Sequence, residues 1–191
     1  MRVPNGTYKI INDPTGYNNT QAYCINPAGA MAGTYYDNLN SIIHGFLRSP
    51  NGTFTPFDPP NNIYTLGPYF INPAGAITGI FQDATYQYRG FLRNPDGTLI
   101  TVDPSDSTYT QPVGINPAGT IAGYYYQVVY YSPPRGFLRA PNGAFTTFDY
   151  PGTPGSTYPF AINPTGEIAG YYTDSSGNQQ CFLRIPAHPD E

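Results

Sequence analysis

The sequence is poor in charged residues and in the residue types that most catalytic and metal sites use. Only 10% of the 191 residues are charged, there are two histidines and two cysteines, and tryptophan is absent. A nucleic-acid-binding surface needs clustered Lys and Arg, but the net charge is −4 and Lys9 is the single lysine. No apolar run approaches the roughly 20 residues of a membrane-spanning helix. The composition therefore argues against nucleic acid as a partner and against a membrane span.

The residues that remain for chemistry form no catalytic or metal motif. No serine lies in a Gly-x-Ser-x-Gly setting, and no His or Cys cluster has the spacing of a zinc site. Two acids for glycoside hydrolysis, such as Asp106 and Asp149, are available among the twelve carboxylates, but the pattern does not select them. We therefore predict no catalytic residue, no metal and no cofactor.

What the sequence does contain is a fourfold repeat. An Ile-Asn-Pro-x-Gly phrase begins at Ile25, Ile71, Ile115 and Ile162. A Phe-Leu-Arg phrase follows each one, and its Phe residues are 45, 46 and 45 positions apart: Phe46, Phe91, Phe137 and Phe182. A period of this length without helical patterning is typical of β-propeller blades. The 21 glycines and 22 prolines recur at fixed places, so we interpret them as turn residues of an all-β fold.

Each repeat of about 46 residues has room for four strands. Asn-Pro-x-Gly supplies the turn between the first and second strands, and Pro-Asn-Gly or Pro-Asp-Gly the turn between the third and fourth. The fourth repeat ends after its third strand, whereas the chain begins with a fourth-type strand, residues 6–12. Pairing that strand with residues 180–184 would complete the last blade and close the ring, which removes unpaired sheet edges.

The prediction is therefore one domain over residues 1–191, a closed four-bladed β-propeller. The repeats span about residues 4–49, 50–94, 95–140 and 141–185, with a tail at 186–191. Two alternatives remain open: a half-ring that dimerises into eight blades, and a fragment of a longer ring.

The loops on the two faces of such a propeller differ in character. The Asn-Pro and Pro-Asn-Gly turns share one face and are nearly invariant, while the other loops vary in length and sequence and contain many tyrosines. Loops carry function more often than scaffold elements do, and Tyr combines an apolar face with a polar tip. The candidate binding residues are Tyr17, Tyr36, Tyr64, Tyr86, Tyr88, Tyr109, Tyr126, Tyr130, Tyr131 and Tyr150. Capping of the blade ends is the alternative role, and we expect Tyr124 and Tyr171 to be packing residues.

Three sets of polar residues recur once per repeat. The four Asn residues of the Asn-Pro turns either hold a cation near the axis or close Asx-type turns, and we favour the turns. Arg48, Arg93, Arg139 and Arg184 recur with Asn12, Asp58, Asp103 and Asp149, which we interpret as repeated structural pairs. Asp37, Asp83, Gln127 and Asp174 follow the second strand, where we favour solvated loop residues over a Ca²⁺ site.

Three residues depart from the repeat without suggesting a site. Cys24 and Cys181 are each a single substitution at a small-residue position, and we predict two small buried thiols rather than a disulfide. Glu167 replaces Ala or Thr, and we predict an exposed strand position.

The order Gly-Ile-Asn-x-x-Gly-x-Ile-x-Gly-Tyr, a variable loop, His-x-Phe-Leu and Gly-x-Phe-Thr-x-Phe-Asp resembles the bacterial extracellular repeat named HAF, after His-Ala-Phe. The resemblance covers nearly the whole chain, although the triplet keeps its His only in His44-Gly45-Phe46; the other copies have Arg89, Arg135 and Gln180. The resemblance implies a propeller-like, exported protein, extracellular or periplasmic, and implies no reaction.

These observations favour a non-catalytic binding or scaffold module that recognises a carbohydrate or a protein through the tyrosine-rich face, as a monomer or a homodimer. Two alternatives stay open. One is a small glycan-active hydrolase or lyase with asymmetric acids on that face, and the other is a self-assembling structural repeat protein.

Overall fold

The computed structural model describes residues 6, 8–11, 19–128 and 132–187, and these residues form fifteen β-strands and no helix. The strands make four successive blades. Blade 1 contains β1 (Thr20–Ile25), β2 (Met31–Asp37), β3 (Ile42–Arg48) and β4 (Phe54–Phe57). Blade 2 contains β5 (Asn62–Ile71), β6 (Ile77–Asp83), β7 (Tyr88–Arg93) and β8 (Leu99–Val102). Blade 3 contains β9 (Tyr109–Ile115), β10 (Ile121–Tyr126), β11 (Arg135–Arg139) and β12 (Phe145–Phe148), and blade 4 contains β13 (Thr157–Ile162), β14 (Ile168–Thr173) and β15 (Gln179–Arg184).

Within each blade the strands are antiparallel and neighbours in sequence pair with one another. The predicted turns make this possible. In blade 1, the N–H of Gly29 donates to the carbonyl of Asn26 at 2.9 Å, and Gly29 has φ of 84°, a conformation that favours glycine. The turn before β4 likewise places Gly52 at φ 97°. Repetition of these turns produces the repetition of the sheet.

The hydrophobic core lies between the blades. Phe57 of blade 1 packs with Phe81 and Phe91 of blade 2, and Val102 of blade 2 packs with Phe137 of blade 3. The third interface contains Ala122 of blade 3, Ile168 of blade 4, and the partly buried Phe148 and Phe182. Blades 2 and 3 therefore each have one face toward the preceding blade and another toward the following blade, as expected for a propeller-like stack.

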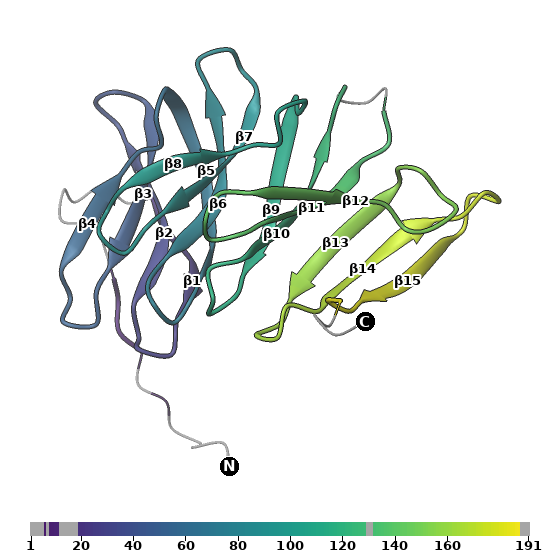
Figure 1. The fold of residues 1–191 in the computed structure, drawn as a ribbon. Helices are drawn as coiled ribbons and strands as arrows, with labels where there is room; N and C mark the ends of the chain where they lie inside the picture. Colours follow the sequence, from purple (N-terminus) through teal and green to yellow (C-terminus); the bar gives the residue numbers. More distant parts are fainter. Residues whose placement is uncertain (1–5, 7, 12–18, 129–131, 188–191) are drawn as a thin grey trace.

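The predicted closed ring is not present. Figure 1 shows the four blades side by side in an open arc, with blade 1 at one end and blade 4 at the other. Blades 2 and 3 are joined into one eight-stranded sheet by a single parallel bridge between Tyr88 and Tyr109, whereas blades 1 and 4 form separate sheets.

The predicted strand at residues 6–12 is also absent from blade 4 over its described part, residues 6 and 8–11. These residues form no strand, and the side chain of Tyr8 is fully exposed. They precede blade 1 (Figure 1), at the other end of the arc from β15. Closure within one chain would require blades 1 and 4 to meet, and no strand pairing joins them among the described residues. Blade 4 accordingly has three strands over the residues that the structure describes.

Candidate functional site

The asparagines of the Asn-Pro turns close their turns, as predicted, and also link one blade to the next. The Oδ1 atom of Asn72 accepts a hydrogen bond from the N–H of Ala76 at 2.9 Å. Its Nδ2 donates to the carbonyl of Asn116 at 3.1 Å, and Asn26 donates in the same way to the carbonyl of Asn72 at 3.2 Å. All three asparagines are buried. The amides of Asn26 and Asn72 therefore link blade 1 to blade 2 and blade 2 to blade 3, and we call these contacts the asparagine relay.

Asn163 in blade 4 makes a different contact. Asn163 has no following blade, and its Nδ2 instead donates to the carboxylate of Glu167. The prediction that Glu167 is simply an exposed strand residue was wrong, because its side chain satisfies the amide that has no neighbouring carbonyl. The one acid in this repeat position thus stands at the terminal blade.

The charged partners of the fourth-strand acids are not the arginines that we predicted. His44 Nδ1 lies 2.8 Å from Asp58 Oδ2, and Arg135 Nη2 lies 2.9 Å from Asp149 Oδ2. The reason is the antiparallel register: Gly45 pairs with Phe57, so the end of the fourth strand lies beside the start of the third. Arg48, Arg93, Arg139 and Arg184 lie at the opposite end of that strand.

Arg93 and Arg139 contact the turn between the third and fourth strands of their blades. Arg93 donates from Nη1 to the carbonyl of Asn94, and its guanidinium lies 5.5 Å from the centre of the Phe57 ring in the preceding blade. Arg184 similarly lies 5.0 Å from the Phe148 ring. Arg93 and Arg184 therefore pack against the preceding blade at two of the three blade interfaces.

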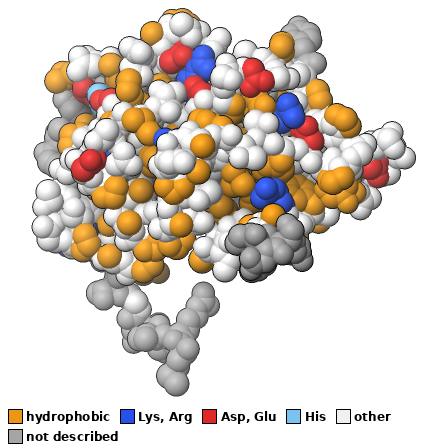
Figure 2. Space-filling model, viewed as in Figure 1, with side chains coloured by type: hydrophobic (Ala, Val, Ile, Leu, Met, Phe, Trp, Pro, Cys, Tyr) orange, Lys and Arg blue, Asp and Glu red, His pale blue; other side chains and the backbone are white. Residues whose placement is uncertain are grey.

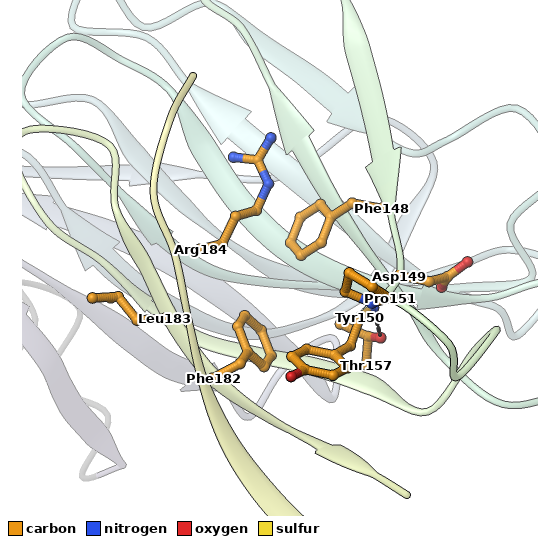
Figure 3. A pocket seen from close by; sticks show the side chains of 8 residues that line it. All are labelled: Phe148, Asp149, Tyr150, Pro151, Thr157, Phe182, Leu183 and Arg184. Atoms are coloured by element: carbon orange, nitrogen blue, oxygen red, sulfur yellow. Dashed lines mark hydrogen bonds between the residues drawn. The ribbon is translucent and has the colours of Figure 1, made fainter. Parts of the chain in front are cut away.

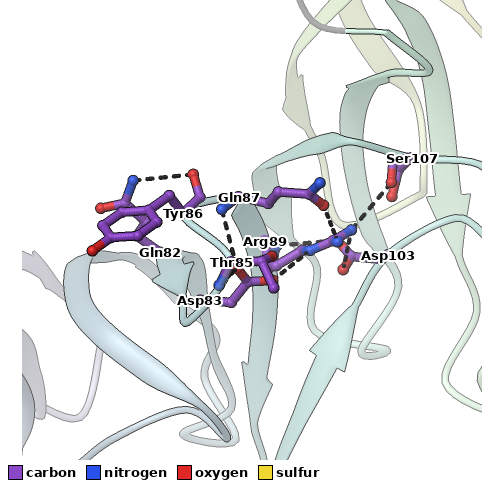
Figure 4. Close-up of polar contacts among 9 residues, drawn as sticks. Gln82, Asp83, Thr85, Tyr86, Gln87, Arg89, Asp103 and Ser107 are labelled. Carbon is purple, nitrogen blue, oxygen red and sulfur yellow. Dashed lines mark hydrogen bonds and ion pairs between the residues drawn. The ribbon is translucent and has the colours of Figure 1, made fainter.

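Blade 2 contains the most extensive charged network, shown in Figure 4. Arg89 lies between two carboxylates, with Nε 3.1 Å from Asp83 Oδ2 and Nη1 3.3 Å from Asp103 Oδ2. Arg89 also donates to the carbonyl of Ser107 at 3.1 Å. Burial raises the pKa of Asp103, although hydrogen bonding and the charge of Arg89 act against that shift. The network holds a partly buried acid in place and leaves neither carboxylate unpaired.

The acids that follow the second strands close turns. Asp37 Oδ1 accepts a hydrogen bond from the N–H of Leu39, and Asp83 and Asp174 accept from the N–H groups of Thr85 and Ser176 in the same way. An Asx-type turn explains these residues, which agrees with the loop role that we favoured over a calcium site.

His44 and its two acids are the arrangement closest to a catalytic group. Its Nε2 lies 3.8 Å from Asp37 Oδ2, on the other side of the ring from Asp58, and its ring stacks on Tyr35. Arg89 occupies the same repeat position in blade 2 and makes the same two kinds of contact. Because Arg takes the place of His in an equivalent network, the position has a structural role within the blade. The geometry therefore favours no acid–base reaction at His44.

Three of the predicted binding tyrosines meet in one cluster, which extends over blades 2, 3 and 4. Tyr109 lies 5.6 Å from Tyr88 and 5.5 Å from Tyr126, measured between ring centres. Tyr124 lies 6.1 Å from Tyr126 and 5.6 Å from Tyr158. We call the following set the aromatic cluster: Tyr88, Tyr109, Tyr124, Tyr126, Tyr158, Phe160 and Tyr171.

The other predicted tyrosines do not join this cluster. Tyr86 is 74% exposed at the tip of a turn, and Tyr64 and Tyr36 lie in β5 and β2. Tyr150 stacks on Tyr172 with 3.6 Å between ring centres, at the interface of blades 3 and 4. Tyr17, Tyr130 and Tyr131 lie outside the described residues.

An apolar groove adjoins the aromatic cluster. It has a volume of about 410 Å³ and runs across the first strands of blades 2, 3 and 4. We call it the inner groove; its lining residues are Tyr69, Phe70, Gln111, Pro112, Val113, Tyr124 and Phe160. Phe160 is 58% exposed, so its ring is accessible to a ligand in the groove. Figure 2 shows that charged side chains are sparse among the hydrophobic ones on the face in view.

The hydroxyl groups near the inner groove are neutral donors and acceptors. Burial raises the pKa of Tyr124, and the neighbouring Tyr109 adds to this shift. Burial, together with a hydrogen bond to Tyr126, raises the pKa of Tyr158 to about 12. Tyr109 donates its hydroxyl hydrogen to Gln111 Oε1 at 3.1 Å. An apolar surface with a few oriented neutral polar groups is typical of small-ligand sites.

The sequence interpretation missed several members of this site. We expected Tyr124 and Tyr171 to be packing residues, and Phe160 and Gln111 were not singled out. Strand alternation does show that Tyr124 and Tyr126 share a face of β10. The approach of Phe160 and Tyr69 to that face depends on how the blades stack, which the repeat does not specify.

The two cysteines are free, as predicted, but only one is covered. Cys24 Sγ lies 3.2 Å from the carbonyl of Pro68 in the next blade, and burial raises the pKa of this thiol to about 11. Cys181 is exposed on β15, which corrects the prediction of a buried thiol. Its counterparts in blades 1 to 3 are glycines beside a fourth strand, and blade 4 has no such strand.

Comparison with known proteins supports the fold alone. No protein-family model and no curated protein matches the chain. Among solved structures, TolB from Acinetobacter baumannii is similar with a TM-score of 0.54 and 13% identity, over 84% of this chain and 39% of that one. A streptogramin B lyase has a TM-score of 0.48 with 14% identity, over 87% of this chain and 56% of that one.

A variant of the Aleuria aurantia lectin in complex with Fucα1-6GlcNAc has a TM-score of 0.41 with 16% identity, over 88% of this chain and 64% of that one. The chain therefore spans less than two thirds of the length of each of these three proteins. The likeness to TolB supports a β-propeller-like, all-β arrangement. No helix among the described residues is long and apolar enough to cross a membrane.

Proposed function

We propose that the chain is a non-catalytic binding module that recognises a carbohydrate through the inner groove and the adjoining aromatic cluster. The observation that carries the proposal is the exposed ring of Phe160 beside Tyr124 and Gln111 in a groove of about 410 Å³. The apolar faces of sugar rings stack on aromatic side chains, and their hydroxyls pair with neutral amide and hydroxyl groups.

The charge of the chain supports a neutral ligand. The net charge is −4, and each of Arg89 and Arg135 is already engaged with an acid. An anionic ligand would need free, clustered cations. We further propose an exported location and membership of the HAF-type repeat family, for which the sequence resemblance is the support.

A glycan array followed by titration tests the binding proposal. Replacement of Phe160→Ala removes a stacking surface and is expected to weaken binding to a bound glycan about 2- to 10-fold, in line with the usual energy of an aromatic contact. Tyr86→Ala is the matched control, because Tyr86 is equally large and more exposed but lies outside the groove; it should leave binding unchanged.

Two outcomes would contradict the proposal. One is the absence of binding to any immobilised glycan, and the other is equal loss of binding in the Phe160 and Tyr86 variants. A protein ligand is the runner-up, since aromatic side chains are also enriched in protein interfaces. A protein from the source organism that binds the native chain but not the Phe160→Ala variant, in the absence of any glycan binding, would favour that second function.

A further inference from the structure

Within the part of the chain that the structure describes, the outer edge of blade 4 lacks the strand that covers the other blades. β3, β7 and β11 each pair with a fourth strand, whereas β15 pairs with β14 alone among the described strands. The side chain of Leu183 on β15 is 61% exposed, while its counterpart Leu92 on β7 is 6% exposed. An unpaired edge of this kind presents free backbone donors and acceptors to another strand.

The missing strand is present in the sequence at the start of the chain. Gly6-Thr7-Tyr8-Lys9-Ile10-Ile11-Asn12 follows the fourth-strand pattern of blade 3, Gly143-Ala144-Phe145-Thr146-Thr147-Phe148-Asp149. Tyr8 thus corresponds to Phe145, and Ile11 corresponds to Phe148. Both counterparts are packed in interfaces, yet Tyr8 is fully exposed and Ile10 is 85% exposed. The segment has the residues of a fourth strand without its partners.

A cavity lies where the first large side chain of that strand would sit. It has a volume of about 360 Å³, and Figure 3 shows Phe148 and Phe182 among its lining residues. At the preceding interface the corresponding place is filled: Phe145 lies 5.8 Å from Phe137 between ring centres and packs in the same cluster as Val102. Tyr8 is the repeat counterpart of Phe145, so it is the side chain expected to fill the cavity.

The next contact in the register is complementary as well. Gly45 and Gly136 face the rings of Phe57 and Phe148, and an added Cβ at Gly136 would lie 2.6 Å from the Phe148 ring. In blade 4 the glycine is replaced by Cys181, and the facing residue in the same register is Ile11. The larger third-strand residue therefore meets a smaller fourth-strand side chain, which preserves the total volume.

We propose that residues 8–11 of one copy add the fourth strand to β15 of a second copy. Residues 8–11 precede blade 1 and β15 lies in blade 4, at the opposite ends of the open arc (Figure 1). The end face of blade 1 also has an apolar residue without a neighbouring blade. Ile25 is 65% exposed there, while its counterparts Ile71 and Ile115 are half-buried between blades. The contact continues an interface that the chain already forms three times internally.

The geometry of the contact determines which assemblies are possible. Each copy offers one strand and one acceptor edge, which is a heterologous arrangement that either closes into a ring or extends as a filament. Propellers typically have four to eight blades. Two four-bladed arcs that exchange strands reach the upper end of this range, so the expected product is a closed dimer.

A directed disulfide tests the pairing between copies. Cys181 and Ile11 would be directly opposite, with Cα atoms about 4.5–5.5 Å apart, within the range that a disulfide bridges. The donor chain carries Ile11→Cys with Cys24→Ser and Cys181→Ser, and the acceptor carries Cys24→Ser alone. Neither chain contains a pair of cysteines, so a mixed disulfide can form only between copies. Mild oxidation of the mixture should yield a cross-linked dimer on a non-reducing gel.

The control donor carries Ile10→Cys in place of Ile11→Cys. Residue 10 is equally near in sequence, but its side chain points to the other face of the strand, so cross-linking should be at least several-fold lower. Equal cross-linking from both donors would overturn the proposal, as would none from Ile11→Cys. A second pair, Lys9→Cys in the donor and Leu183→Cys in the acceptor, with Cys24→Ser and Cys181→Ser in both chains, tests the same register if the first donor folds poorly.

A single chain that carries Ile11→Cys, Cys24→Ser and the native Cys181 shows whether the fourth strand comes from a second copy or from the same chain. A covalent dimer in this chain supports exchange between copies. A disulfide that forms only within one chain would show closure of a single ring instead, and would overturn the proposal.

Discussion

Blade 2 and blade 4 are built from the same repeat but differ in one strand. In blade 2, β8 covers β7, and Phe91 is completely buried while Leu92 is 6% exposed. In blade 4, Phe182 is half-buried and Leu183 is 61% exposed, because β15 is an edge. The comparison teaches that the Phe-Leu-Arg phrase becomes core only when a fourth strand and a following blade are both present.

The same comparison separates structural repetition from function. Asn72 donates to the next blade, while Asn163 turns to Glu167. Arg89 bridges two acids in blade 2, while Gln180 takes its position in blade 4. The repeated groups thus change their partners where a neighbouring blade is missing. The aromatic cluster instead combines side chains from β7, β9, β10, β13 and β14.

The largest expected effect comes from the core phenylalanines. Phe91→Ala should lower the free energy of unfolding by about 3–5 kcal/mol, the usual cost of removing a buried Phe ring. Phe182→Ala should cost about half of that or less in dilute solution, because the ring has fewer partners. Urea denaturation measures both variants, and equal losses would contradict the difference between the two blades.

The next effect concerns the asparagine relay. Asn72→Ala removes two buried hydrogen bonds and leaves the N–H of Ala76 without its acceptor, so we expect a loss of about 2–4 kcal/mol in the free energy of unfolding. Asn163→Ala is the matched change at the end of the arc and should cost about 1–2 kcal/mol. A loss at Asn163 that matched or exceeded the loss at Asn72 would argue against a relay between blades.

A smaller effect is expected from Arg89→Gln, which gives blade 2 the residue type of blade 4. The substitution removes both ion pairs and leaves Asp103 partly buried without a cation, at an expected cost of about 1–3 kcal/mol. The loss should be greater at pH 7 than at pH 4, because protonation of Asp103 removes its need for a cation and its pKa is raised by burial. An equal loss at both pH values would contradict this account of the network.

The smallest expected effect is a difference in thiol reactivity between Cys24 in blade 1 and Cys181 in blade 4. In dilute solution at pH 8, Cys181 should react readily with a disulfide reagent because it is exposed. Cys24 should stay unreacted, since a pKa of about 11 leaves only about 0.1% of the thiol ionised and the group is half-buried. Counting modified thiols with Cys24→Ser and Cys181→Ser as references measures this, and rapid reaction of both would contradict the placement of Cys24.

Much of the fold follows from the sequence, because turn chemistry and strand alternation are local. The Asn-Pro and Pro-Asn-Gly turns mark where each strand ends and the next begins. The structure has strands and turns at these places in all four blades. Closure was not predictable in this way, since it depends on whether blades 1 and 4 meet. The partner of Asp58 was wrong for a different reason: applying the antiparallel register would have identified His44 in place of Arg48.

The candidate site was predictable only in part. Tyr88, Tyr109 and Tyr126 belong to the variable face that the repeat distinguishes, and the structure brings them together. Phe160 was not predictable, because its role arises from the approach of β13 to β9 and β5 around a groove. Contacts of that kind depend on the curvature of the whole arc and leave no mark in a single repeat.

Hydrogen exchange of β15 at several protein concentrations tests the central claim most directly, namely that blade 4 is an incomplete blade that receives its fourth strand from a second copy. β7 and β11 should be protected to the same extent at all concentrations, because each is covered within its own chain. The amides of Gln179–Arg184 that point away from β14 should exchange rapidly in dilute solution and become protected as the concentration rises, whereas those that bond to β14 are protected throughout. Protection of the outward-pointing amides that does not depend on concentration, whether high or low, would contradict the account.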